Sequence, residues 1–181
     1  SPHTIIEIIQ SDMPFMVDSV RMALSRLGIT SHLLLHMPIS HKRDKDNQVT
    51  DLLRPGTRDD NFVDTAFLIE VDRQSTKDEL KALKKELSSV MEEISLAVSD
   101  WQPMVTKLSE VAEEVTADYY PGSKEEKQNI QAFLRWLADD NFTITGYRSY
   151  DLKPVKGDYE LSQTEDSSLG LMRNSVSEKG R

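Results

Sequence analysis

Cysteine is absent from this chain of 181 residues. Its absence excludes disulfide bonds, thiolate zinc sites and a cysteine nucleophile, and it fits a reducing cytoplasm, which is the expected location. No run of about 18 apolar residues occurs, so no transmembrane helix is predicted. The first residues also lack the basic-then-apolar pattern of a secretory signal peptide.

Closely spaced glycines are also missing. The seven glycines stand at positions 28, 56, 122, 146, 157, 170 and 180, and no two are two or three residues apart. A G-x-G-x-x-G turn, which holds dinucleotide phosphates at a helix N-terminus, is therefore excluded. We predict no NAD site, no catalytic constellation and no metal site within this chain.

Positive charge is in short supply. The chain has 31 acidic and 22 basic residues, for a formal net charge of −9. Proteins that bind nucleic acid neutralise phosphates with clustered Lys and Arg, and anionic membrane surfaces attract the same residues. Neither nucleic acid nor a membrane is therefore an expected partner.

The apolar periodicity that is present predicts an α+β domain over residues 1–117. We expect three strands and two helices, at about 4–10, 13–27, 29–42, 65–72 and 76–115 in chain order. Asp12 is the expected N-cap of the first helix, with Pro14 in its first turn and Gly28 at its end. Residues 44–61 are predicted to be an exposed loop. Strand-like residues begin almost at once, which suggests a piece of a longer protein.

Residues 118–181 are predicted to connect this domain to a later part of the polypeptide. A helix is expected at about 124–139, after a capping box of Ser123 and Glu126, and a strand or hairpin at about 142–162. Pro103 is expected to kink or interrupt the 76–115 helix. The polar residues from about Ser162 are predicted to be a mobile tail, apart from 169–172.

The order strand, helix, strand, strand, helix is typical of a split-βαβ, ferredoxin-like sheet with helices on one face. Two alternatives stay open for the strand at 142–152. It supplies the fourth strand of this sheet, or it is the truncated start of the next domain.

Several segments resemble one family, spread in order over nearly the whole chain. They are "SDMPFMVDSV" at 11–20, "HLLLHMP" at 32–38, "VSDWQPM" at 98–104, "QAFLRWLADDNFTITGYRSYDL" at 131–152 and "LGLMR" at 169–173. They are similar to the N-terminal, ACT-like region of the large-type bacterial NAD-dependent glutamate dehydrogenases. Asp64-Thr65 stands where the family pattern has a Glu-Ser pair.

The resemblance implies a long parent enzyme that oxidises L-glutamate to 2-oxoglutarate and ammonia with NAD, with its catalytic domain downstream of this chain. It also implies an ACT-type module, and such modules often bind amino acids and pair through their sheets. The expected partners are thus the rest of the parent polypeptide and other subunits of a homo-oligomer. A free amino-acid effector is the remaining candidate.

One candidate ligand site follows, at the turn from the first strand into the first helix, residues 11–18. Its expected residues are Ser11, Asp12, Met13, Pro14 and Phe15. Backbone N–H groups at a helix N-terminus can hold the carboxylate of an amino acid. The ACT pattern has glycine after the proline, whereas here Phe15 stands there and can fill the site or pack at an interface.

Two functions therefore remain for the chain. The first is a non-catalytic regulatory or scaffolding module, and the alternative is an allosteric amino-acid sensor at the 11–18 turn. His32 and His36 lie on one face of a predicted strand. We interpret them as hydrogen-bonded residues of a sheet surface or subunit interface rather than as metal ligands, because no third ligand is evident.

Overall fold

A computed structural model describes residues 2–54, 62–155 and 157–174 of the chain. The chain divides into two compact units, Ser1–Ile94 and Ser95–Arg181, which we call unit 1 and unit 2. Unit 1 has the predicted α+β class, with helices on one face of an antiparallel sheet. The ACT-like, split-βαβ fold predicted from the sequence is confirmed.

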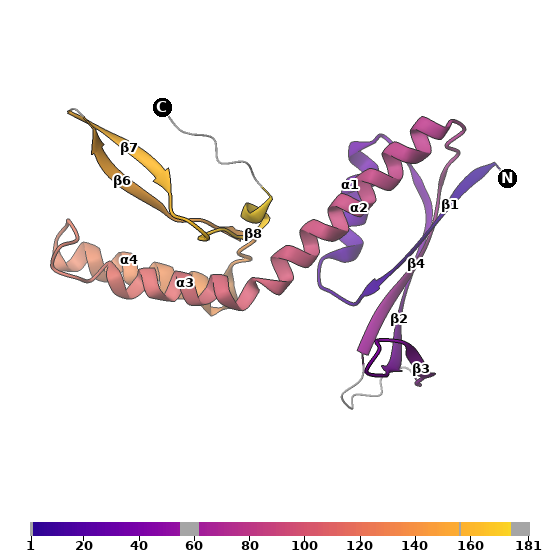
Figure 1. Ribbon diagram of the computed structural model, residues 1–181, viewed down its shortest axis with the longest axis horizontal. Helices are drawn as coiled ribbons and strands as arrows, with labels where there is room; N and C mark the ends of the chain where they lie inside the picture. Colours follow the sequence, from indigo (N-terminus) through magenta and orange to yellow (C-terminus); the bar gives the residue numbers. More distant parts are fainter. Residues whose placement is uncertain (1, 55–61, 156, 175–181) are drawn as a thin grey trace. The chain divides into compact units, whose positions relative to one another are not determined.

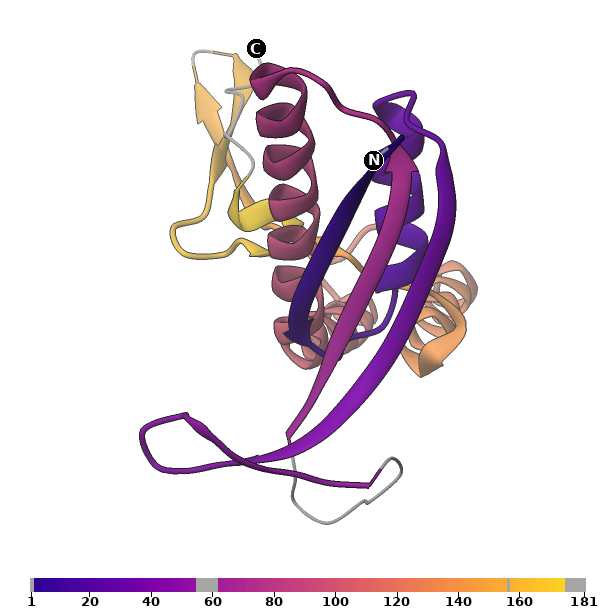
Figure 2. The same ribbon diagram turned by 90° about the vertical axis from the view of Figure 1, so that its right-hand side faces the viewer.

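Unit 1 consists of a four-stranded antiparallel sheet covered on one face by two helices (Figures 1 and 2). Its elements are β1 (His3–Ser11), α1 (Met16–Arg26), β2 (Ser31–Arg43), β3 (Val49–Leu52), β4 (Phe62–Asp72) and α2 (Lys77–Ser99), whose last turn passes into unit 2. The strand order is β1-β4-β2-β3. The parallel strands β1 and β2 are thus separated by β4, as a split βαβ arrangement requires.

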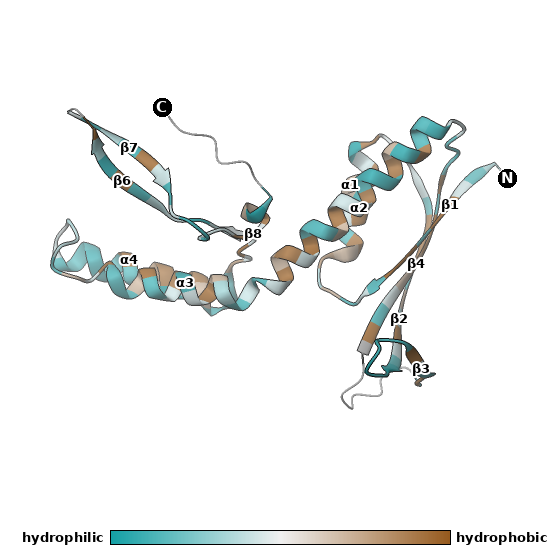
Figure 3. Ribbon diagram, in the orientation of Figure 1, coloured by the Kyte–Doolittle hydropathy of each residue, from teal (hydrophilic) through white to brown (hydrophobic). Residues whose placement is uncertain are grey.

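The core lies between the helices and one face of the sheet. Phe67, Ile69 and Val71 alternate along β4 and are almost fully buried, because successive side chains of a strand point to opposite faces. Val20 and Leu24 of α1 are buried too. Apolar stretches alternate with polar ones along both helices (Figure 3), as in helices that bury one side.

The opposite side of this sheet, which we call the open face, carries apolar side chains without a covering layer among the described residues. Ile9 lies opposite Ala66 on β4, and Ala66 lies opposite Met37 on β2. Ile9 is 72% exposed and Met37 54%. Ile5 and Leu35, at other positions of this face, are also exposed.

Two predictions about unit 1 are wrong in detail. The first helix begins at Met16 rather than at residue 13, because residues 14 and 15 form a turn and Phe15 is the N-cap. Asp12 therefore does not cap the helix, and Pro14 precedes its first turn. The predicted 44–61 loop contains β3, which pairs with β2. Its residues 55–61 lie outside the described residues.

The long predicted helix 76–115 is two helices. α2 ends at Ser99 and α3 (Trp101–Glu114) begins after Asp100, its N-cap. Pro103 thus falls in the first turn of α3, where its missing N–H removes no helical hydrogen bond. Since α3 contacts α4 and β8, unit 1 ends before the predicted domain limit at residue 117.

Unit 2 combines two helices with short strands. α4 (Lys124–Trp136) is followed by a single π turn (Leu137–Asn141), and the strands are β5 (Gly146–Tyr147), β6 (Tyr150–Val155), β7 (Asp158–Gln163) and β8 (Leu169–Gly170). The capping box of Ser123 and Glu126 is present. β5 pairs with β8 and β6 pairs with β7. The predicted strand 142–152 therefore adds nothing to the first sheet, whose fourth strand is β3.

Residues 169–172, which were excepted from the predicted mobile tail, form β8 and most of a 3₁₀ turn (Leu171–Arg173). The tail is more structured than predicted at residues 162–163, which belong to β7, and at Arg173, which is bound to Asp100. Residues 175–181, also part of that predicted tail, lie outside the described residues.

Candidate functional site: the turn between β1 and α1

The predicted ligand turn lies where β1 ends at Ser11 and α1 begins at Met16. Asp12 still follows the strand register, because its N–H donates to the carbonyl of Val63 at 2.8 Å. Met16 is buried and fixes the helix to the core. The turn is therefore held at both ends by unit 1 itself.

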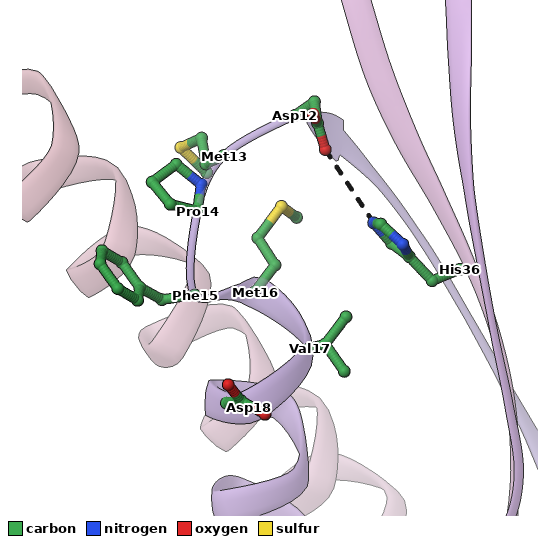
Figure 4. Close-up of a pocket in the computed structure, with 8 residues that line it drawn as sticks. All are labelled: Asp12, Met13, Pro14, Phe15, Met16, Val17, Asp18 and His36. Atoms are coloured by element: carbon green, nitrogen blue, oxygen red, sulfur yellow. Dashed lines mark ion pairs between the residues drawn. The ribbon is translucent and has the colours of Figure 1, made fainter. Parts of the chain in front are cut away.

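The carboxylate of Asp12 faces the sheet instead of the helix. It accepts a short hydrogen bond from the hydroxyl of Thr65, a fully buried side chain on β4. Nε2 of His36 on β2 lies 4.0 Å from the same carboxylate oxygen (Figure 4). It also lies 3.4 Å from the Thr65 hydroxyl. The structure thus brings together Asp12, Thr65 and His36, a grouping that the sequence did not reveal.

Phe15 takes an unusual backbone conformation for its type. Its φ of 70° lies in the left-handed region, which non-glycine residues rarely adopt and which costs about 1–2 kcal/mol. Its side chain is 54% exposed and lies on the far side of the turn from Asp12 and His36 (Figure 4). The glycine preference of this position in the ACT pattern agrees with that φ, while the phenyl ring leaves the side toward His36 open.

An open hollow of about 300 Å³ lies at this turn. It is lined by Asp12, Met13, Pro14, Phe15, Met16, Val17, Asp18 and His36. Four of the five predicted site residues line it, and Ser11 does not. Its volume is at the lower end of the range for small-molecule sites.

The chemistry of this hollow is mixed. No side chain caps α1, so the first N–H groups of the helix keep their affinity for an anion. Two carboxylates, those of Asp12 and Asp18, line the same hollow and attract a cation. A group carrying both charges, such as the carboxylate and ammonium of an amino acid, matches this arrangement better than a simple anion does.

From the sequence, His32 was interpreted as a hydrogen-bonded residue of a sheet surface or subunit interface, and in the structure it contacts Asp72. Its Nε2 lies 2.8 Å from the carboxylate of Asp72, and its ring centroid is 4.6 Å from that of His3. The backbone N–H of Thr30, and next the His32 contact, lower the pKa of the Asp72 carboxyl. Across the described ranges, no group of three or more His, Asp or Glu residues is arranged to hold a metal ion.

A second polar cluster, which the sequence did not predict, lies at the end of the sheet away from Asp72, where Ser11 pairs with Asp64. The carboxylate of Asp64 is 2.8 Å from Nε2 of His41 and 2.6 Å from the guanidinium of Arg43. His41 is 2% exposed. The only sequence signal was that Asp64 departs from the Glu of the family pattern.

A third cluster, also missed, lies within unit 2. Asp100 accepts a hydrogen bond of 2.7 Å from the backbone N–H of Gly170 and two from the guanidinium of Arg173, at 2.5 and 2.9 Å. The Arg173 hydrogen bonds lower the pKa of the Asp100 carboxyl, against an opposing effect of desolvation. These three residues form the Asp100 cluster. Positions 70 and 73 residues apart carry no periodic signal that would have linked them.

The described residues do not fit an NAD molecule. The sheet of unit 1 is antiparallel, whereas dinucleotides bind at the carboxyl ends of parallel strands beside a glycine-rich turn. The carboxylates of Asp12 and Asp18 in the hollow would repel a pyrophosphate. We therefore derive no chemical step of this chain through NAD.

Comparison with known proteins agrees with this geometry. Residues 1–87 match the family model described as "Glutamate dehydrogenase, ACT1 domain". Residues 1–87 belong to this ACT1 domain family. The family predicted from the sequence is thus confirmed, and the ACT1 domain coincides with the sheet, α1 and the first half of α2.

The similarity to whole proteins extends beyond the ACT1 domain. Over 176 residues the chain is 35% identical to an NAD-specific glutamate dehydrogenase of Halomonas elongata, and over 174 residues it is 32% identical to one of Pseudomonas aeruginosa. Each alignment covers 96% of this chain but 11% of the relative. The chain therefore spans about a tenth of the length of these relatives, and unit 2 belongs to the shared region.

Within the described ranges, no helix is both long and apolar enough to cross a membrane.

Proposed function

We propose that this chain is a non-catalytic regulatory and scaffolding module of a cytoplasmic NAD-dependent glutamate dehydrogenase. The parent enzyme would convert L-glutamate and NAD to 2-oxoglutarate, ammonia and NADH. The relatives named as NAD-specific glutamate dehydrogenases support the parent activity. The short share of their length that the chain covers supports a module rather than a whole enzyme.

One structural observation carries the scaffolding role: the open face of the ACT1 sheet. Ile5, Ile9, Leu35 and Met37 are each more than two-fifths exposed on it. Exposed apolar side chains that share one face of a sheet favour an interaction site, because their burial is favourable. Other subunits or the remaining polypeptide are the partners that the proposal requires.

Unit 2 supports the same role. The β6–β7 hairpin exposes Leu152, Tyr159 and Leu161, which are 60%, 67% and 52% accessible. A lone two-stranded hairpin is marginally stable in water. Such a hairpin gains stability when another part of a larger assembly covers it.

Deletion from the parent enzyme tests this proposal. Removal of the region that corresponds to this chain should reduce oligomer size in light scattering, or the response to effectors, while purified chain alone should show no glutamate turnover. A truncated enzyme with native assembly and native regulation would contradict the proposal. Turnover by the isolated chain would contradict its non-catalytic part.

The alternative function is an amino-acid sensor at the turn between β1 and α1, and the hollow there is the observation that favours it. The uncapped N-terminus of α1 would take the ligand carboxylate, and Asp12 would take its ammonium. Thermal unfolding against the common amino acids, 2-oxoglutarate and NAD tests this. A ligand at a hundredfold excess over Kd stabilises the folded state by about 2.7 kcal/mol.

A positive result has a clear specificity test. Asp12→Asn should abolish the rise in melting temperature if the ammonium is bound there, whereas Asp118→Asn, a change at an exposed position of unit 2, should leave it unchanged. If no ligand shifts the melting temperature, the sensor function is rejected and the scaffolding role stands alone.

A further inference from the structure

Helix α4 of unit 2 is held to its own unit by polar side chains. It lies alongside α3, as Figure 1 shows. Lys127, Gln131 and Arg135 are spaced four residues apart and therefore share one side of α4. Nζ of Lys127 donates to the carbonyl of Ala117 at 2.7 Å. Gln131 and Arg135 donate to the carboxylate of Glu113 at 3.3 and 2.7 Å, so this side of α4 faces α3 and the turn after it.

The opposite side of α4 carries a row of apolar side chains, Ile130, Phe133 and Trp136, which we call the α4 stripe. They are 45%, 57% and 50% exposed, and α4 has no buried side chain. The rings of Phe133 and Trp136 stack, with their centroids 6.1 Å apart and their planes 15° apart. A helix of a soluble protein normally buries its apolar side. Within the described part of the chain, the α4 stripe lies open instead.

Acidic groups stand at both ends of the stripe. Glu126 lies four residues before Ile130 and hence on the same side of the helix. Asp139 and Asp140 follow Trp136 at the other end; both are exposed, and neither forms an ion pair within the described ranges. The partial negative charge at the end of a helix disfavours carboxylates there. A cation brought by a partner would therefore be attracted by both the carboxylates and the helix dipole.

We propose that the α4 stripe is the docking surface for an amphipathic helix of the same parent polypeptide, from outside this chain. The apolar side chains of that helix pack on the stripe, and one of its arginine or lysine residues meets Asp139 and Asp140. Aromatic residues are the commonest anchors of protein interfaces, and a guanidinium also stacks well on an aromatic ring. The stripe and the acidic pair beside it fit both parts of such a helix.

The comparisons and the charge of the chain favour this occupant. The matched region includes α4 but is only 11% of each relative, so most of the parent polypeptide lies outside it. A segment of the same polypeptide binds at a high effective concentration, because the linker keeps it near the stripe. The formal net charge of the chain is −9, which attracts a basic segment and repels an acidic one.

The same charges disfavour α4 of a second copy as the occupant. In an antiparallel twofold contact between two α4 helices, Glu126 of each copy would approach the acidic pair, Asp139 and Asp140, of the other. In a parallel contact, the two acidic pairs would meet. Like charges at short distance are destabilising in both arrangements.

This inference rests on the proposed scaffolding role in that it names a contact for it. The two can fail separately. If deletion of the chain from the parent enzyme disrupts assembly but Trp136 stays accessible in the intact enzyme, the scaffolding role holds and the α4 contact is wrong.

Hydroxyl-radical footprinting with mass spectrometry compares Trp136 in the 181-residue chain with Trp136 in the intact parent enzyme. We expect its oxidation to be at least about tenfold slower in the parent, because a docked helix excludes water from the stripe. Equal oxidation in the two proteins overturns the proposal. Protection that appears in the isolated chain as its concentration rises also overturns it, since a second copy then covers the stripe.

The acidic pair is tested in the parent enzyme by the double substitution Asp139→Asn and Asp140→Asn. Asparagine tolerates the left-handed backbone of Asp140, whose φ is 52°, so the change removes charge without new strain. Oxidation of Trp136 should rise several-fold. The control Asp118→Asn removes a carboxylate at an exposed position outside the stripe and should leave the oxidation unchanged. Unchanged protection in the double variant overturns the proposal, because the occupant is then not held by a basic residue.

Photochemical cross-linking identifies the occupant directly. With p-benzoylphenylalanine in place of Phe133 in the parent enzyme, we expect a cross-link to a segment outside this chain that contains arginine or lysine. The product should have the mass of one polypeptide. A product of twice that mass, a cross-link to residues of this chain, or no cross-link overturns the proposal.

Discussion

Unit 1 buries apolar side chains between a sheet and two helices, whereas unit 2 holds its last described residues to α3 through the carboxylate of Asp100. Twelve of the fifteen buried apolar side chains among the described residues belong to unit 1, and α4 contributes none. Apolar burial is non-directional and scales with area, so unit 1 has a distributed source of stability. In unit 2 a few directional contacts, the Asp100 cluster, take a larger share.

This difference bears on function. The hollow of unit 1 at the turn between β1 and α1 is supported by the core sheet, since both strands that supply Thr65 and His36 belong to that sheet. Unit 2 exposes apolar side chains of its hairpin on an element with little support of its own. Under the proposed scaffolding role, neighbouring parts of a larger protein would cover the exposed apolar side chains of this hairpin.

The largest effect is expected from a substitution in the core of unit 1. Ile69→Ala removes a fully buried side chain from the middle of the sheet and should lower the free energy of unfolding by about 3–4 kcal/mol. Chemical denaturation followed by circular dichroism measures it. Ile9→Ala, at a position 72% exposed on the open face, is the matched control and should cost far less. A loss for Ile69→Ala as small as the control would mean that the core is not where we place it.

The next effect concerns the backbone at the Asp100 cluster. Gly170 has φ 57° and ψ −137°, and an added Cβ would lie 2.4 Å from the carbonyl oxygen of Thr145. Gly170→Ala should therefore destabilise unit 2 by about 2–4 kcal/mol through strain and overpacking. Hydrogen exchange at residues 145–147 and 169–173 should show lost protection.

Gly157 offers the matched control for this change. Its φ is also positive, at 90°, but a Cβ there meets nothing within 4 Å. Gly157→Ala should therefore reduce protection only in the β6–β7 hairpin. Equal losses at 169–173 in both variants would refute the close contact with Thr145.

A smaller effect comes from the charge of Asp100. Asp100→Asn keeps the shape but loses the charge-assisted bonds to Arg173, and should cost about 2 kcal/mol. The folded-state pKa of Asp100 lies below its usual value of 3.8. Its contribution is thus complete above that value and is lost as the pH falls through the lower, folded-state pKa.

Acid unfolding of unit 2 followed by hydrogen exchange or NMR checks this sign. The native chain should lose protection at 169–173 below about pH 4, as the carboxylate is protonated. Asp100→Asn should show weaker protection at neutral pH and a flatter acid dependence, while Asp118→Asn should behave like the native chain. An unchanged acid profile in Asp100→Asn would exclude the carboxylate as the origin.

Most of the fold could be predicted from the spacing of apolar residues along the sequence. The alternation of β4 and the stripe of α2 follow from backbone geometry, so local residues suffice to predict them. β3 was missed because its four residues are all exposed and polar residues surround them. The predicted start of α1 was wrong because Asp12 is a residue type that commonly forms the N-cap of a helix. In the structure its carboxylate instead accepts a hydrogen bond from Thr65, 53 residues away.

The candidate site was predicted as a segment but not as a constellation. The turn residues are contiguous, and four of them line the hollow. Thr65 and His36 join Asp12 only through the pairing of β2 with β4 and β1 with β4, which fixes three distant positions side by side. Single-sequence patterns contain the strands but not their register, so the partners of Asp12 could not be named in advance.

The smallest expected effect comes from removing the hydrogen bond between Thr65 and Asp12 at the turn between β1 and α1. Thr65→Val keeps the shape of a buried side chain but removes the hydroxyl that donates to Asp12, and should cost about 1 kcal/mol. In a double-mutant cycle with Asp12→Asn, the two changes should show a coupling energy, because Asp12→Asn removes the charge of the carboxylate that accepts the hydrogen bond from Thr65. Thr50→Val, at an exposed position of β3, serves as the control and should not couple with Asp12. Additive effects of Thr65→Val and Asp12→Asn would mean that the Asp12 carboxylate is not held by the sheet, and then the hollow would lack the fixed charge that an ammonium ligand needs.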